Sequence, residues 1–265
     1  MPGIRTSWPW IVAAIGFATY PIVRPYADET TSAGLLAMAS NTWLLAHLLG
    51  VLAFAALPIA LSRLGRRLAP DGSRAADSLG PLSYLALVLL LPYYGAETFG
   101  LHAIGQYASP GDTTLLTVVD GVRYQPGAIT LFGLGLIALA AVGVLLAITA
   151  WSHGARLRAA GLVTGVALAL YLPQFFGTPT MRIAHGVLLG LGCLAVGFAA
   201  RSPRSPRPPA RRRSWPGPNT ASGPLSSARW WTGPPRRPPA APRPGRPSSS
   251  ASCLPSASPA ACAYG

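Results

Sequence analysis

Long apolar segments dominate the first 200 residues and limit what this chain can fold into. The hydrocarbon core of a bilayer is about 30 Å thick and an α-helix rises about 1.5 Å per residue, so one crossing needs roughly 20 mainly apolar residues. Six segments qualify: residues 8–27, 42–61, 81–100, 126–150, 159–178 and 181–200. The sequence therefore predicts an all-α membrane protein, with about six transmembrane helices forming a bundle over residues 1–200.

The first segment begins like a secretory signal peptide, because Arg5 precedes an apolar run. However, the stretch from Ala18 to Pro21 is a poor small-residue cleavage site, and five more apolar segments follow. We therefore expect an uncleaved first helix.

Arginines alternate between the connections of the six segments, and this alternation predicts an orientation. The connection 62–80 holds four Arg, the connection 151–158 holds two, and Arg5 lies near the N-terminus. The other three connections have one Arg at or beside each and together hold four acidic residues. Short cytoplasmic loops of membrane proteins carry an excess of Arg and Lys. The chain is therefore predicted to lie in the cell membrane as a multi-pass protein with both termini in the cytoplasm.

The last 65 residues have a different composition. Residues 201–265 hold eleven Arg, 16 Pro and no acidic residue, whereas residues 1–200 hold ten Arg and all seven acidic residues. Such a segment cannot bury enough apolar surface to offset the entropy of ordering, so it is predicted to be a disordered cytoplasmic tail. Three interpretations of the tail stay open: contact with anionic lipid headgroups, recognition by a partner of Pro-rich segments, or a shifted-frame extension without a role. Because the net positive charge is mostly in this tail, no specific nucleic-acid binding is expected.

Polar residues inside the apolar segments are the candidate site. With a rise of about 1.5 Å per residue, His47, Glu97, Gln174 and His185 lie roughly 5 to 8 Å below the predicted outer face, on four different segments. Ionisable groups in hydrocarbon are costly and are default candidates for function. These four are therefore the ligand-binding candidates. We expect His47, Glu97 and His185 to point into the bundle and to lie close together.

Three interpretations of this outer polar layer stay open. In the first, the polar groups only tie helices together, and Arg24 and His102 at the same level are read in this way. In the second, the layer is an outward-facing pocket for a small solute or ion, with Glu97 as the charged anchor. In the third and weakest, His47 and His185 ligate a metal or haem, since imidazole suits such metals.

No catalytic motif accompanies the polar layer. The sequence has no Gly-rich phosphate loop after a strand, no nucleophile elbow, no HExxH and no CxxCH, so no catalytic residue, enzyme activity or cofactor is predicted. The pairs Gly161/Gly165 and Gly186/Gly190 are four residues apart, a spacing that lets helix backbones approach closely in lipid.

In general character, residues 1–200 resemble the many uncharacterised small multi-pass integral membrane proteins of high-GC bacteria. The apolar segments, the abundance of Ala, Gly and Pro, and the use of Arg as the sole basic residue carry this resemblance. No motif of a named family matches. The leading hypothesis is binding or transport of a small ligand through the outer polar layer of a protein whose partner is the lipid bilayer. The alternative is a structural or accessory membrane subunit, and association with further copies of the chain is compatible with either.

Overall fold

The computed structural model describes residues 7–69 and 73–201, and this part of the chain contains helices and no strand. The predicted all-α fold is confirmed. Six longer helices are present in the described ranges: α2 (Trp8–Val23), α4 (Asn41–Leu68), α5 (Arg74–Gly95), α8 (Pro126–Trp151), α9 (Ala155–Ala169) and α10 (Pro179–Ala199). Shorter elements connect them: α3 (Ser32–Met38), the π-helix η2 (Ala96–Gly100), α6 (Leu101–Gly105), α7 (Leu116–Arg123) and the 3₁₀ helix η3 (Pro173–Phe176). The predicted disordered tail lies outside the described residues, apart from Arg201.

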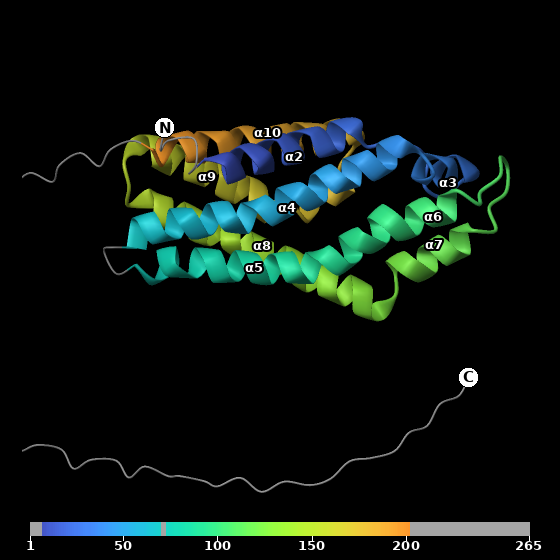
Figure 1. The fold of residues 1–265 in the computed structure, drawn as a ribbon, viewed down its shortest axis with the longest axis horizontal. Helices are drawn as coiled ribbons and strands as arrows, with labels where there is room; N and C mark the ends of the chain where they lie inside the picture. Colours follow the sequence, from blue (N-terminus) through green and yellow to red (C-terminus); the bar gives the residue numbers. More distant parts are fainter. Residues whose placement is uncertain (1–6, 70–72, 202–265) are drawn as a thin grey trace, which may run out of the picture. The chain divides into compact units, whose positions relative to one another are not determined.

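The six longer helices lie lengthwise beside one another (Figure 1), and their contacts close into a ring. Each packs on the next along the chain, from α2 through α4, α5, α8 and α9 to α10, and α10 returns to pack against α2. Consecutive helices run in opposite directions, as in an up-and-down bundle (Figure 1).

Four helical stretches in the described residues are long and apolar enough to cross a membrane: Asn41–Leu68, Arg74–Gly105, Pro126–Trp151 and Pro179–Ala199. The stretch Arg74–Gly105 comprises α5, η2 and α6. Helix α2 is apolar but has only 16 residues, and α9 has 15. The chain therefore has the helices of a membrane protein, and the two short members of the ring occupy the first and fifth predicted segments.

Several helix limits differ from the predicted segments, for local reasons. Helix α2 ends at Val23 because Arg24 precedes Pro25, and a residue before proline is disfavoured in the α conformation; the ψ angle of Arg24 is 126°. The predicted connection 62–80 is largely helical, since α4 continues to Leu68 and α5 begins at Arg74.

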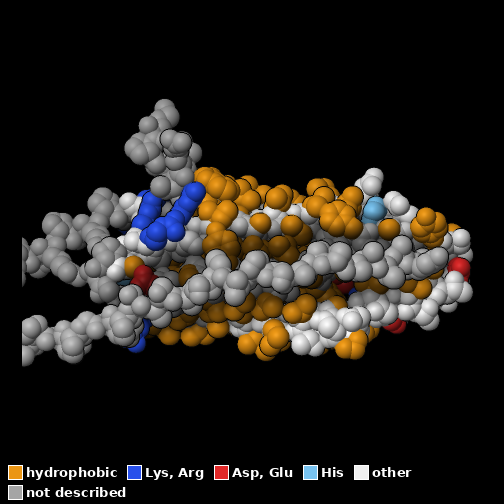
Figure 2. Space-filling model, turned by 60° about the horizontal axis from the view of Figure 1, so that its bottom comes forward, with side chains coloured by type: hydrophobic (Ala, Val, Ile, Leu, Met, Phe, Trp, Pro, Cys, Tyr) orange, Lys and Arg blue, Asp and Glu red, His pale blue; other side chains and the backbone are white. Residues whose placement is uncertain are grey.

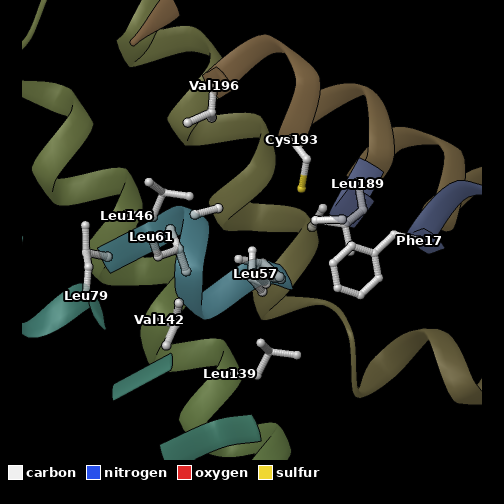
Figure 3. Packing of buried hydrophobic residues seen from close by; sticks show 14 of the residues in the cluster. Phe17, Leu57, Leu61, Leu79, Leu139, Val142, Leu146, Leu189, Cys193 and Val196 are labelled. Carbon is white, nitrogen blue, oxygen red and sulfur yellow. The ribbon is translucent and has the colours of Figure 1, made fainter. Parts of the chain in front are cut away.

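The centre of the ring is a continuous apolar core. Figure 3 shows side chains from five of the helices converging there: Phe17, Leu57, Leu61, Leu79, Leu139, Val142, Leu146, Leu189, Cys193 and Val196. All are buried, and Cys193 is fully buried as a small apolar residue, as expected from its sequence context.

Glycines allow close contacts between neighbouring helices. A Cβ placed on Gly186 would lie 2.6 Å from the carbonyl oxygen of Phe17, and one on Gly190 would lie 2.6 Å from that of Ala14. A Cβ on Gly165 would lie 2.4 Å from the carbonyl oxygen of Gly143. The predicted role of the glycine pairs in helix packing is confirmed.

The two ends of the bundle differ in charge. Figure 2 shows hydrophobic side chains along the length of one face, with Arg side chains gathered at one end. This basic end is where α4 and α8 end and where α5 and α9 begin; its arginines are Arg63, Arg66, Arg67, Arg74, Arg156 and Arg158. The guanidinium of Arg63 lies 5.4 Å from the ring of Trp8, which joins the end of α4 to the start of α2.

Candidate functional site

Three short helices, α3, α6 and α7, extend the bundle at the end opposite the basic end (Figure 1). A second apolar cluster joins them to α4, formed by Leu35, Met38, Trp43, Leu101 and Val119. We call these three helices the cap. The sequence does not predict α3 or α7, because helices of seven and eight residues have too few apolar positions to show a period.

Four charged side chains form one network at the base of the cap, and we call Arg24, Glu29, Glu97 and Arg123 the cap network. Arg123 donates to both carboxylate oxygens of Glu97, at 2.8 Å from Nε and 3.1 Å from Nη2. Its Nη1 donates to Glu29 at 2.6 Å, and Arg24 donates to the other oxygen of Glu29 at 2.5 Å. Side-chain exposures are 13% for Arg123, 12% for Glu97, 10% for Arg24 and 27% for Glu29, so the charges compensate one another largely out of water.

Two residues of α4 adjoin this network. The indole Nε1 of Trp43 donates to the backbone carbonyl of Glu97 at 2.8 Å, and its ring lies 5.0 Å from the guanidinium of Arg24. The buried His47 donates from Nδ1 to the carbonyl of Trp43 at 2.8 Å, which leaves Nε2 facing the carboxylate of Glu97 at 3.9 Å. The expected proximity of His47 and Glu97 is therefore present.

Glu97 lies on the π-helix η2, where the amide of Leu101 donates to the carbonyl of Ala96. Single π turns within α-helices are rare and are frequent at functional sites. The turn changes the direction of the side chains on either side of it. Glu97 points to Arg123 and His47, whereas His102 contacts the carbonyl of Met38 at 2.9 Å and joins α6 to α3.

Within the described residues, the other two candidates make no hydrogen bond or ion pair with Glu97. Nε2 of His185 donates to the carbonyl of Ala167 at 2.8 Å, and the histidine makes no ion pair with Glu97. Gln174 lies in the 3₁₀ helix η3 and is half-buried. The expected cluster of three is therefore a pair, His47 and Glu97, because His185 is fixed to the backbone of α9 instead.

Three tyrosines occupy the space between the two histidines, Tyr94 and Tyr171 buried and Tyr20 half-buried. The ring of Tyr20 lies 5.4 Å from that of His47, and the ring of Tyr171 lies 5.6 Å from that of His185. Tyr94 stands between them, 6.3 Å from Tyr20 between ring centroids and hydrogen-bonded to Tyr171 at 3.2 Å between hydroxyls. The two histidines thus belong to one aromatic interior without sharing a ligand site.

Two polar atoms beside the cap network are buried and have no hydrogen-bond partner among the described residues: Nε of Arg24 and the hydroxyl of Tyr26. Both lie in the connection between α2 and α3, and the guanidinium of Arg24 is 5.4 Å from the ring of Tyr26. A buried donor without a partner costs roughly 1 to 3 kcal/mol, more for a charged group.

The structure also bears on the metal hypothesis for His47 and His185. Over residues 7–69 and 73–201, no group of three His, Cys, Asp or Glu side chains has the arrangement to hold a metal ion. One ring nitrogen of each histidine, Nδ1 of His47 and Nε2 of His185, contacts a backbone carbonyl instead.

Acid is expected to loosen the cap through Glu29. Burial raises the pKa of this carboxyl, but the guanidiniums of Arg24 and Arg123 outweigh burial and hold its pKa below the usual 4.5. A depressed folded pKa contributes stability that is present above about pH 4.5 and is lost as the pH falls through the folded value. The melting temperature of the protein in detergent is therefore expected to be level from about pH 7 to pH 5 and then to fall.

The variant Glu29→Gln isolates this contribution, because it keeps the shape and removes the charge. We expect it to melt at a lower temperature at pH 7 and to lose less on acidification. The exposed Asp120→Asn is the matched control and should titrate like the native chain. Equal acid sensitivity in native protein and Glu29→Gln would contradict the assignment.

Comparisons with protein-family models, with curated proteins and with solved structures find no match to this chain.

Proposed function

We propose that the chain is a six-pass protein of the cell membrane, with both termini in the cytoplasm, that binds or transports a small ligand at its outer polar layer. The crossings by α2 and α9 are supported by their outer surfaces. Ile15 of α2 is 54% exposed and Val166 of α9 is 47% exposed, much as Leu52 of α4 is 55% exposed. Such apolar surface is stable against lipid and unfavourable against water.

The observation that carries the ligand proposal is the pair of unsatisfied buried groups, Nε of Arg24 and the hydroxyl of Tyr26. Both can donate a hydrogen bond, and one belongs to a permanent cation. The complementary group is an anionic oxygen. Because Glu29 and Glu97 already accept from arginine on all four oxygens, the charged anchor is Arg24 rather than the expected Glu97.

A small carboxylate has the complementary chemistry. It would take two donors at once and be held by a charge-assisted hydrogen bond, which is roughly twice as strong as a neutral one. A carboxylate that also carries an ammonium group would face Glu29 or Glu97 with its positive end. Amino acids and simple organic acids are therefore the ligand class proposed.

Thermal unfolding of the full-length protein in detergent tests this proposal. We expect acetate, lactate, glycine or proline to raise the melting temperature, and acetamide, the neutral analogue, to leave it unchanged. Tyr26→Phe removes one donor and should reduce the shift. Tyr124→Phe is the control, since Tyr124 is 64% exposed near the same end of the bundle. No shift with any carboxylate, or an equal shift in Tyr26→Phe, would overturn the ligand class.

The alternative is a structural or accessory subunit whose cap network only holds the cap on the bundle. Complete pairing of the two carboxylates favours it. The variant Glu97→Gln separates the two proposals, because the amide oxygen still accepts one of the two hydrogen bonds from Arg123, which also keeps its ion pair with Glu29. If the network is structural only, the variant should behave as the native chain in every ligand assay. If the network closes a site, the variant should fold and change ligand affinity.

Orientation is tested by labelling single cysteines in intact cells. Cys253 and Cys262 are first replaced by serine, whereas Cys193 is fully buried and can stay. We expect a cysteine at Asp112 to react with an impermeant maleimide from outside and one at Ser152 to react after permeabilisation alone. The opposite pattern would reverse the topology.

A further inference from the structure

An open groove runs along the outside of the bundle between α9 and α10. Its volume is about 490 Å³, and its walls are apolar, with Val163 on α9 and Leu191, Ala195 and Phe198 on α10 among the lining residues. Leu191 and Phe198 are 60% and 58% exposed, so the groove faces outward, away from the core of the ring. One charged residue, Arg156, lies at its end.

The length of the groove along α10 is close to the thickness of one membrane leaflet. It follows α10 from Leu191 to Ala199, which at about 1.5 Å per residue is about 12 Å. One leaflet of hydrocarbon is about 15 Å thick. Because α9 begins and α10 ends at the basic end, the groove starts at the membrane surface and descends into the hydrocarbon.

Arg156 is available to a ligand. Its side chain is exposed, and within the described ranges it makes no hydrogen bond or ion pair. The neighbouring Arg158 is held differently: its Nε donates to the carbonyl of Trp151 at 3.0 Å and its guanidinium lies 5.3 Å from the Trp151 ring. The open cation at the groove is therefore Arg156.

From this juxtaposition we propose that the groove is a binding site for an anionic phospholipid, with one acyl chain between α9 and α10 and the phosphate on Arg156. The apolar walls match a hydrocarbon chain, and the guanidinium matches a phosphate oxygen pair. This site is separate from the cap network: it rests on the proposed membrane crossing by α9 and α10 and not on the proposed ligand.

The depth of the groove is set by small residues. Gly192 lies on its floor, where a Cβ would be 2.6 Å from the hydroxyl of Thr164, and Ala195 is an exposed small side chain in its wall. A large side chain at position 195 would fill the groove from the outside without entering the core. Ala195→Trp is thus a variant that blocks the acyl chain and leaves the fold intact.

Native mass spectrometry of the full-length protein tests the proposal, with palmitoyl-oleoyl phosphatidylglycerol and phosphatidylcholine as probes. We expect one phosphatidylglycerol to be retained more strongly than phosphatidylcholine. Arg156→Gln should weaken retention about fivefold, as expected for about 1 kcal/mol per charge at a membrane surface. Ala195→Trp should abolish the retained lipid.

Two matched variants control for charge and bulk. Arg74→Gln removes an exposed arginine of the basic end that does not line the groove, and Ala141→Trp adds bulk on the exposed face of α8. Neither should change retention. Equal losses in Arg156→Gln and Arg74→Gln, no loss in Ala195→Trp, or equal retention of both lipids would overturn the site. A dimer that Ala195→Trp dissociates would assign the groove to a second copy of the chain and would also overturn it.

Discussion

Replacing Arg123 with glutamine is expected to lower the free energy of unfolding by about 3 kcal/mol. Removing one partner from a buried ion pair leaves an uncompensated charge and costs roughly 3 to 5 kcal/mol; the lower figure is appropriate because Glu29 is 27% exposed. Arg123→Gln removes three hydrogen bonds to carboxylates at once and leaves Glu97 without its charged donor. Reversible unfolding in mixed micelles measures the change.

A double-mutant cycle with Glu97→Gln shows whether the loss belongs to the pair. The double variant Arg123→Gln, Glu97→Gln removes both charges and lets two amides hydrogen-bond, so it should be more stable than Arg123→Gln alone. Such a recovery is the signature of an uncompensated buried charge. Additive losses would mean that Arg123 acts on the cap through Glu29 or through packing on Trp43, not through Glu97.

Replacing Gly143 with alanine is expected to destabilise the bundle by about 2 to 3 kcal/mol. Helices α8 and α9 touch at this point: a Cβ on Gly143 would lie 2.3 Å from the carbonyl oxygen of Gly165 and 3.1 Å from the amide of Ala169. Both neighbours are backbone and cannot rotate away, so the helices must separate. Overpacking of this kind typically costs 1 to 3 kcal/mol.

Gly133 provides the matched control on the same helix. It lies one residue beyond Phe132 on α8, and a Cβ there would meet nothing within 4 Å. Since alanine is favoured over glycine in a helix by about 1 kcal/mol, Gly133→Ala should be neutral or stabilising. A similar effect of the two substitutions would show that helix propensity, and not the contact between α8 and α9, decides the outcome.

The sequence alone predicted the helical fold and the approximate places of the long helices. A helix in lipid satisfies its backbone hydrogen bonds within one segment, so an apolar stretch of sufficient length specifies its own structure. The same holds for local breaks: Pro25 ends α2 through the conformation of the residue before it. The four helices suited to crossing a membrane correspond to predicted segments.

Both members of the pair formed by His47 and Glu97 were also within reach of the sequence. His47 and Glu97 were singled out because an ionisable group within an apolar segment is costly, and the structure brings them to 3.9 Å. His185 satisfied the same criterion but bonds to Ala167, since depth along a helix does not fix the face to which a side chain points.

Only the tertiary structure decided which charges Glu97 meets. Arg123 lies 26 residues from Glu97 and 94 residues from Glu29 in the chain. It belongs to α7, a connecting helix that is too short to be predicted from periodicity. The π turn that aims Glu97 also leaves no mark in hydropathy. Hydropathy and proline positions act within a few residues, whereas the cap network depends on how separate connections fold over one end of the ring. The sequence therefore determined the helices, and long-range packing determined the site.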